Sequence, residues 1–381
     1  RRLHTLTGHT RGVTAVAVVD GPDGPLAITT SDDRTAIVWN PAAGRRLHTL
    51  QGHNDNVNAV AVVDGPDGPL AITTSWNTTA IVWDPVTGRR LHTLANHTDR
   101  VTVAAYAVAV VDGPDGPLAI TTVWDRTAIV WNPVTGRRLH TLTGHAGSVT
   151  AVAVVDGPDG PLAITTSDDQ TAIVWNPVTG RRLHTLTDHA GDVNAGVVVD
   201  RPDGPRAAFR RQPGGVTAVG AFDGPDGPLA ITTVWDRTAI VWNPVTGRRL
   251  HTLRGHNDNV TAVAVVDGPD RPLAITTSND RTAIVWNPVT GRRLHTLRGH
   301  NDNVTAVAVV DGPDGPLAIT TSDDRTAIVW NPVTGETVHR FHLPYKGGSV
   351  AVCGPGLLLA YGSEVAYFEW PPPHLGSPST W

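Results

Sequence analysis

The sequence is nearly without sulfur: it has one cysteine, Cys353, and no methionine in 381 residues. One cysteine excludes an internal disulfide and a cysteine-based zinc site, and it fits a reducing compartment, so we expect a cytoplasmic protein. Lysine is almost missing as well, because Lys346 is the one lysine among 30 basic residues. Since the chain neither begins with methionine nor contains one, we expect it to be part of a larger multidomain protein.

Several patterns that mark particular functions are also missing. No apolar run reaches the roughly 20 residues that a membrane-spanning helix needs, and no segment has helical periodicity. The net charge of −5 disfavours nucleic acid and anionic membranes as partners. The sequence has neither a glycine-rich phosphate loop ending in Lys-Ser or Lys-Thr nor a G-x-S-x-G motif. We therefore expect no nucleic-acid or membrane partner, no cofactor, no metal and no catalytic residues.

What the sequence has in abundance is one repeated segment. The motif "IVW" recurs with spacings of 44, 48, 44, 67, 44 and 44 residues between its tryptophans. A period of about 44 residues is typical of a four-stranded propeller blade. The tryptophans of this motif are Trp39, Trp83, Trp131, Trp175, Trp242, Trp286 and Trp330.

Each repeat predicts four short strands and no helix. In the first copy these are residues 13–19, 26–30, 35–39 and 45–50, rich in β-branched residues and separated by turns such as "DGPDGP" and "NPAAG". A sheet this small cannot bury both of its faces alone, but it can do so when similar sheets stack around an axis. The pattern therefore predicts an all-β propeller of four-stranded antiparallel blades.

The two ends of the repeated region complement one another. Residues 1–6 read as a fourth strand that has no blade, whereas residues 348–370 offer three strands that have no fourth. Pairing the two would close the ring and remove its exposed sheet edges. We expect a single propeller over residues 1–370, closed in this way, and a proline-rich tail over residues 371–381.

The interval of 67 residues contains a degenerate half-repeat at about residues 189–212. Counting complete sets of strands favours eight blades, and seven or nine remain alternatives. With eight blades, we expect the half-repeat to form an extra hairpin outside the ring or wedged into it.

The repeats resemble those of the WD-repeat β-propeller family over residues 1–370. The resemblance rests on "GH" pairs such as "TGH" at residues 7–9, and on an aspartate six residues before the "IVW" tryptophan. It implies a hydrogen-bonded relay of histidine, threonine, aspartate and tryptophan inside a blade. The implied sets are His9, Thr29, Asp33 and Trp39; His97, Thr121, Asp125 and Trp131; His145, Thr165, Asp169 and Trp175; His256, Thr276, Asp280 and Trp286; and His300, Thr320, Asp324 and Trp330.

Two blades depart from that relay. The second blade has Asn77 in place of the aspartate, and the last blade has Lys346, Ala360 and Glu364 at the relay positions. We expect packing to hold the last blade together. A second set of histidines, in the outer "LHTL" strands, we interpret as a polar edge that discourages pairing with other chains. This set is His4, His48, His92, His140, His184, His251 and His295.

The copies differ from one another at two places only. The loop after the relay histidine and the turn before the "IVW" strand vary, whereas "DGPDGP" and "NPVTG" barely change. In an up-and-down blade the two variable connections share one face of the ring, and the two constant ones share the other. Because binding residues concentrate in loops that a rigid scaffold positions, we expect the variable face to contact a partner.

The partner contacts that we predict all lie in these variable loops. Trp76, Trp124 and Trp235 each precede the turn aspartate or asparagine by one residue, and tryptophan is enriched in binding hot spots. The alternative is that each indole packs over the neighbouring blade. The charged candidates are Arg11, Asp55, Asp99, Arg100, Asp192, Asp258 and Asp302.

The sequence thus favours a non-catalytic scaffold that binds a protein or peptide. It also resembles the high-identity WD-repeat arrays of some NOD-like receptors and related modular signalling proteins, in which the propeller is the ligand-sensing end. One alternative is an enzyme whose site lies at the mouth of the central channel. The other is a purely structural repeat array.

Overall fold

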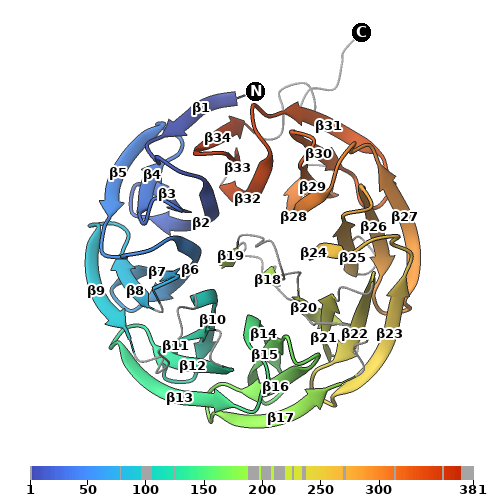
Figure 1. Cartoon of the computed structure of the whole chain (residues 1–381), viewed down its shortest axis with the longest axis horizontal. Coiled ribbons are helices and arrows are strands. Elements are labelled where there is room, and N and C mark those ends of the chain that lie inside the picture. The colour runs from blue at the N-terminus through green and yellow to red at the C-terminus, as the bar shows by residue number, and fades with distance from the viewer. Residues whose placement is uncertain are drawn as a thin grey trace.

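Valine, isoleucine and threonine dominate the repeat, and the computed structural model shows that they form strands arranged as a β-propeller of eight blades (Figure 1). The all-β prediction and the favoured blade number are confirmed. No helix occurs in the part of the chain that the structure describes, so none there could span a membrane. The structure describes residues 2–77, 79–95, 105–123, 126–187, 197–198, 207–209, 219–224, 227–233, 237–268, 272–312, 315–353 and 356–369.

Each blade is an antiparallel meander whose strands a to d run from the axis outward. Blade 1 consists of β2 (Val13–Gly21), β3 (Gly24–Ser31), β4 (Ala36–Asn40) and β5 (Arg45–Leu50). Blade 2 consists of β6 (Val57–Gly65), β7 (Gly68–Ser75), β8 (Ala80–Asp84) and β9 (Arg89–Leu94). Blade 3 consists of β10 (Ala105–Gly113), β11 (Gly116–Val123), β12 (Thr127–Asn132) and β13 (Arg137–Thr143). Blade 4 consists of β14 (Val149–Gly157), β15 (Gly160–Ser167), β16 (Ala172–Asn176) and β17 (Arg181–Leu186).

The second half of the ring follows the same order. Blade 5 consists of β20 (Val219–Gly224), β21 (Gly227–Thr233), β22 (Thr238–Asn243) and β23 (Arg248–Arg254). Blade 6 consists of β24 (Val260–Asp267), β25 (Pro272–Ser278), β26 (Thr282–Asn287) and β27 (Arg292–Arg298). Blade 7 consists of β28 (Val304–Gly312), β29 (Gly315–Ser322), β30 (Thr326–Trp330) and β31 (Thr337–His342). Blade 8 consists of β32 (Gly347–Cys353), β33 (Gly356–Tyr361), β34 (Glu364–Glu369) and β1 (Arg2–Thr7).

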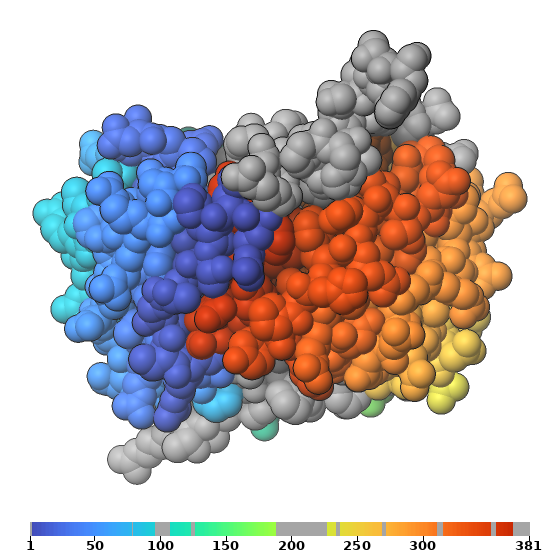
Figure 2. All heavy atoms as spheres, turned by 90° about the horizontal axis from the view of Figure 1, so that it is seen from above, coloured from blue at the N-terminus to red at the C-terminus, as the bar shows by residue number. Residues whose placement is uncertain are grey.

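Blade 8 closes the ring by joining the two ends of the chain. Strand β1 pairs antiparallel with β34, with Leu6 opposite Val365 and Thr7 opposite Glu364. Figure 2 shows the N-terminal residues in dark blue directly beside the C-terminal ones in red. This blade lacks the relay residues, and it is packed by buried leucine, tyrosine and phenylalanine side chains, including Tyr361. The predicted closure is confirmed.

The a–b turns show why "DGPDG" recurs. In blade 1 Gly21 pairs with Gly24, which leaves a two-residue loop between the strands. Gly24 has a φ of +108°, a conformation that side chains with a Cβ rarely adopt. A Cβ added at Gly21 would lie 2.9 Å from the Gly24 carbonyl oxygen. Both glycines are therefore required by this tight hairpin.

The core lies between the blades because the two faces of each sheet pack against different neighbours. Between blades 1 and 2, Ile28 and Val38 of one sheet belong to the same buried cluster as Val60, Ala71 and Trp83 of the next. Alternate residues of a strand point to opposite faces, so Trp39 packs on the other side, against blade 8. Each blade is thus stable only in the company of its neighbours.

The outer histidines link adjacent blades, which the sequence interpretation of a polar edge missed. His48 Nε2–H of blade 1 donates to the Val86 carbonyl of blade 2 over 2.8 Å. The imidazole also fills the space that a Cβ at Gly88 would need, since the two would approach to 2.6 Å. The other pairs are His4–Ala42, His92–Val134, His140–Val178, His184–Val245, His251–Val289 and His295–Val333.

The prediction of an extra hairpin for the half-repeat was wrong. Two of its segments are described as strands, β18 (Val197–Val198) and β19 (Ala207–Phe209), and both lie near the centre of the ring (Figure 1). They belong to different sheets, because β18 pairs parallel with β20 and β19 pairs antiparallel with β6. The physical reason is that strand a of every blade has one edge that faces the axis and can accept another strand. Blades 2 and 5 therefore have five strands each.

Candidate functional site

A buried relay of four side chains crosses blade 1. The indole Nε1–H of Trp39 donates to Thr29 Oγ1 over 2.8 Å. Thr29 Oγ1 lies 2.8 Å from His9 Nε2, and His9 Nδ1 lies 2.9 Å from Asp33 Oδ2. An indole only donates and a carboxylate only accepts, so the imidazole Nδ1–H donates to Asp33. Every donor in the chain from Trp39 to Asp33 then has an acceptor.

Asp33 is the last residue of this relay, and its carboxylate also accepts hydrogen bonds from the d–a loop and from the b–c turn. Its Oδ2 accepts the Thr10 N–H at 2.9 Å, and its Oδ1 accepts the Thr35 N–H at 3.0 Å and the Thr35 hydroxyl at 2.6 Å. Burial raises the pKa of this carboxyl, but the hydrogen bonds from His9, Thr35 and Thr10 outweigh burial and hold the pKa of Asp33 well below its usual range. The ionised carboxylate therefore ties the d–a loop to the b–c turn.

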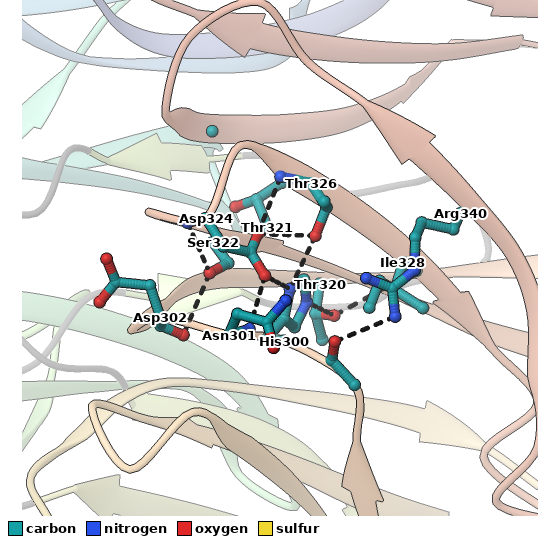
Figure 3. A network of polar contacts seen from close by, with 12 residues as sticks. His300, Asn301, Asp302, Thr320, Thr321, Ser322, Asp324, Thr326, Ile328 and Arg340 are labelled. Carbon is teal, nitrogen blue, oxygen red and sulfur yellow. Dashed lines mark hydrogen bonds and ion pairs between the residues drawn. The ribbon is translucent and has the colours of Figure 1, made fainter.

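Blade 7 shows the same relay from close by (Figure 3). His300 stands between Thr320, at 2.8 Å from Nε2, and Asp324, at 3.1 Å from Nδ1. Burial lowers the pKa of His300 in spite of the neighbouring Asp324, while hydrogen bonds from Thr326 and Asn301 lower the pKa of Asp324 in spite of its burial. Blades 4 and 6 repeat these contacts with His145, Thr165, Asp169 and Trp175, and with His256, Thr276, Asp280 and Trp286.

Blades 3 and 5 are described only in part. Trp131 donates to Thr121 Oγ1 over 2.8 Å, and Trp242 donates to Thr232 Oγ1 over the same distance. The predicted members His97 and Asp125 lie outside the described residues.

Blade 2 keeps the relay geometry with an asparagine in the aspartate position. His53 Nε2 lies 2.8 Å from Thr73 Oγ1, which also accepts the indole N–H of Trp83 at 2.8 Å. Asn77 Oδ1 accepts the Thr79 hydroxyl at 2.6 Å, as Asp33 does from Thr35. Burial lowers the pKa of His53 to about 4, with the hydrogen bond to Asn77 opposing the shift. The sequence interpretation treated this blade as an exception, although "GH" at residues 52–53 marks its histidine.

We name the face of the ring that carries the d–a and b–c connections the loop face; in blade 1 it comprises residues 8–12 and 32–35. Backbone hydrogen bonds join its two connections in blades 1, 2, 4, 6 and 7. In blade 2 the Trp76 N–H donates to the Asn56 carbonyl over 3.0 Å. Equivalent bonds run from Asp32 to Gly12, Asp168 to Ser148, Asn279 to Asn259 and Asp323 to Asn303. The two variable connections of the repeat therefore lie together, as the blade topology predicted.

The described partner candidates all lie on the loop face. Arg11, Asp258 and Asp302 are exposed, and Asp55 and Trp76 are partly buried. Asp258 Oδ1 accepts its own neighbour's N–H, that of Asn259, at 2.7 Å. The indole nitrogen of Trp76 is buried and has no hydrogen-bond partner. The edge of the ring that carries this nitrogen therefore packs against the protein. Trp124, Trp235, Asp99, Arg100 and Asp192 lie outside the described residues.

One further position of the b–c turn was missed by sequence reasoning. The fourth residue of this turn has a left-handed backbone, with φ between 63° and 73°, although it is not glycine. Side chains with a Cβ pay a conformational cost of about 1 kcal/mol or more there. The residues are Arg34, Arg126, Gln170, Arg237, Arg281 and Arg325, and all of them are exposed.

The opposite face carries the constant a–b and c–d turns and has hollows between blades 4 and 5. A cavity of about 470 Å³ lies between blades 4 and 5, lined by Asp159, Arg181, His184 and Val245 among others. Within this hollow His184 Nε2–H donates to the Val245 carbonyl over 2.7 Å and so links the two blades. Across the described ranges no three histidine, cysteine, aspartate or glutamate side chains gather as a metal site would need.

Comparison with known proteins identifies the repeat family and a similar fold. The sequence model of the family described as "WD domain, G-beta repeat" matches residues 1–40, 44–84, 88–132, 136–176, 247–287 and 291–331. Among curated proteins the comparison finds no match. Among solved structures the chain is similar to the crystal structure of the computationally designed Ika8 protein, at 22% sequence identity and a TM-score of 0.76. The similarity covers 97% of this chain and 99% of that one, and at such low identity it concerns the fold alone.

Proposed function

Because the chain belongs to the family of the WD domain, G-beta repeat, we propose that it is a non-catalytic module that binds a protein or peptide through its loop face. Propellers of this family generally act as scaffolds for protein interactions. The proposal that the loop face makes the contact is supported by one observation. The positions at which near-identical copies differ lie together on this face, whereas the opposite face is built from nearly invariant turns.

The rigidity of the loop face supports this assignment. In blade 1 the carboxylate of Asp33 holds both connections, and Asp32 N–H adds a backbone bond to the Gly12 carbonyl at 3.0 Å. Loops that are already ordered lose little conformational entropy when a partner binds. The exposed side chains that they carry, such as Arg11 and Asp302, can then differ between blades without disturbing the ring.

The expected partner is a protein or peptide with mixed charges and an apolar patch. The loop face presents both signs of charge, with Arg11 and Arg34 in blade 1 and Asp258 and Asp302 in blades 6 and 7. Trp76 adds a partly exposed aromatic ring in blade 2, and aromatic anchors among charged groups are typical of binding hot spots. Complementary charges would supply specificity and the rate of association more than affinity.

The rival assignment, an enzyme with a site at the mouth of the channel, has less support. It requires carboxylates or histidines that converge on the innermost loops. The described centre of the ring holds β18 and β19 instead, which are made of valine, alanine and phenylalanine.

A capture experiment tests the proposal. The intact ring is used as bait to recover a partner. The affinity of this partner is then measured for two variants, each with two substitutions to alanine. We expect Trp76→Ala with Arg11→Ala on the loop face to weaken binding at least tenfold. The control, Val333→Ala with Asp20→Ala, changes two residues of the opposite face and should bind as the wild type does. Equal binding by both variants, or loss with the control alone, would show that the loop face is not the contact surface.

A further inference from the structure

The innermost strand of every blade has an edge that faces the axis of the ring. In blade 2 this edge belongs to β6, and β19 pairs with it antiparallel, with Ala207 opposite Ala61 and Phe209 opposite Ala59. Strand β19 also lies against β2, β10 and β32, and Figure 1 shows it inside the ring. An extended segment of three residues thus occupies the channel by adding a strand to a blade.

In blade 7 no described strand pairs with the inner edge of the innermost strand, β28, so the exposure of its side chains can be compared with that of β6. Strand β28 has almost the sequence of β6 and pairs with β29 alone among the described strands. Ala306 and Val310 of β28 are partly exposed, whereas the equivalent Ala59 and Val63 of β6 are 0% and 2% exposed. Burial of an inner strand does not depend on such pairing alone, because Ala151 and Val155 of β14 are 0% and 4% exposed although no described strand pairs with the inner edge of β14.

The chemistry of β19 and β6 defines what this edge accepts. The pairing uses backbone N–H and C=O groups, which carry no sequence preference of their own. The facing side chains Ala59, Val60 and Ala61 are small and apolar, and the strand that pairs with them reads Ala207, Ala208, Phe209. A partner strand needs N–H groups at the paired positions, and the sequence paired here is apolar.

We propose that the axial channel is a strand-binding site for an extended apolar peptide, and that residues 207–209 of the half-repeat occupy it in the folded chain. Residues 207–209 then act as a built-in ligand. They raise the number of paired backbone groups at the axis, and they exclude any other extended segment from the edge of β6. This site is separate from the loop face, and the inference does not depend on the proposed function.

The first test removes the built-in ligand and returns it as a separate peptide. Deletion of residues 190–212 leaves His189 thirty residues before Trp242, the spacing that separates His145 from Trp175 in blade 4. The probe is a synthetic peptide of residues 201–212, and its control is the same peptide with Ala207→Pro and Phe209→Pro, which keeps the charge but removes two backbone donors. We expect the unmodified peptide to bind the deletion variant at least tenfold more tightly than the control peptide does. Equal binding of the two peptides, or binding of neither to a folded variant, would overturn the proposal.

The second test uses the complete chain, in case the deletion variant does not fold. Hydrogen exchange of the backbone amides is compared between β6, whose peptide is marked by Asn58, and β28, which is followed in a peptide of residues 301–315 because shorter ones recur in other blades. We expect the β6 segment around Val60 to exchange at least tenfold more slowly than the segment around Val307. Introducing Ala207→Pro and Phe209→Pro into the complete chain should bring the two rates together. Equal rates in the unmodified chain, or no change with the prolines, would show that β19 does not occupy this edge.

Discussion

Blades 1 and 2 share the sequence of strand b, "GPLAITTS", and differ in the acceptor that ends their relays, Asp33 or Asn77. The geometry is unaffected: the tryptophan–threonine and histidine–threonine distances are 2.8 Å in both. The electrostatics differ, because the carboxylate of Asp33 stays ionised whereas burial takes the pKa of His53 to about 4. The comparison teaches that packing positions the relay, and that one residue decides its charge.

The largest expected effect comes from removing the acceptor in each blade. Asp33→Ala should lower the free energy of unfolding by about 4 kcal/mol, because four hydrogen bonds to a buried carboxylate are lost and the His9 imidazole keeps a donor without a partner. Asn77→Ala should cost only about 1 to 2 kcal/mol, since its hydrogen bonds are uncharged. Urea unfolding of the two variants measures the difference. Equal losses would mean that the charge of Asp33 contributes nothing.

Acid should distinguish the two relays next. The unfolded chain protonates His53 near pH 6.5, whereas the folded chain does so only at about 4. Between these values the unfolded state binds more protons, so stability falls as the pH falls, by about 3 kcal/mol in total for this group. Asp33 has a lowered pKa, so its contribution is present above the unfolded value and is lost only as the pH falls below about 4. Chemical unfolding at pH 7 and pH 4.5, with NMR titration of His53, measures the contribution of His53; an ordinary titration of His53 near pH 6.5 would contradict the prediction.

Giving blade 2 the carboxylate acceptor of blade 1 should reduce this acid sensitivity. Asn77→Asp gives His53 a carboxylate partner, which should raise its pKa and add about 1.5 kcal/mol of stability at pH 7. The mirror change, Asp33→Asn, should cost a similar amount of stability at pH 7 because a charged acceptor is lost. Thermal unfolding at pH 7 and pH 4.5 of both variants is the measurement. If Asn77→Asp leaves the stability at pH 4.5 unchanged, the titration of His53 is not the cause of the acid sensitivity.

The ring itself could be predicted from the sequence because its evidence is repeated many times. Each copy offers the same four runs of β-branched residues and the same turns, and the complementary ends, at residues 1–6 and 348–370, predicted the closure. Blade 2 was set apart from the relay sets because Asn77 stands in place of the aspartate. An amide has the shape of a carboxylate and also offers an oxygen, so the contacts persist.

Contacts between repeats were harder to predict than contacts within them. The hydrogen bond from His48 to Val86 depends on how closely the next blade packs, which no pattern inside one repeat reveals. The pairing of β19 with β6 joins segments far apart in the chain, and three residues, Ala207 to Phe209, are too few to show a strand period. The loop face, in contrast, followed from topology alone, since the Trp76–Asn56 bond joins connections that every up-and-down blade places together.

The smallest expected effect concerns the junction between the two blades that differ. The Thr14 hydroxyl of blade 1 donates to the Val57 carbonyl of blade 2 over 2.6 Å and also contacts Thr30 Oγ1 at 2.7 Å. Thr14→Val keeps the shape but removes this link, and it should cost about 1 kcal/mol because a buried carbonyl loses its donor. Thr14→Ser keeps the hydroxyl and should cost less in urea unfolding, by the loss of one methyl group. If serine is as destabilising as valine, packing at this junction matters more than the hydrogen bond, and the variable position after the loop serves the ring and not a partner.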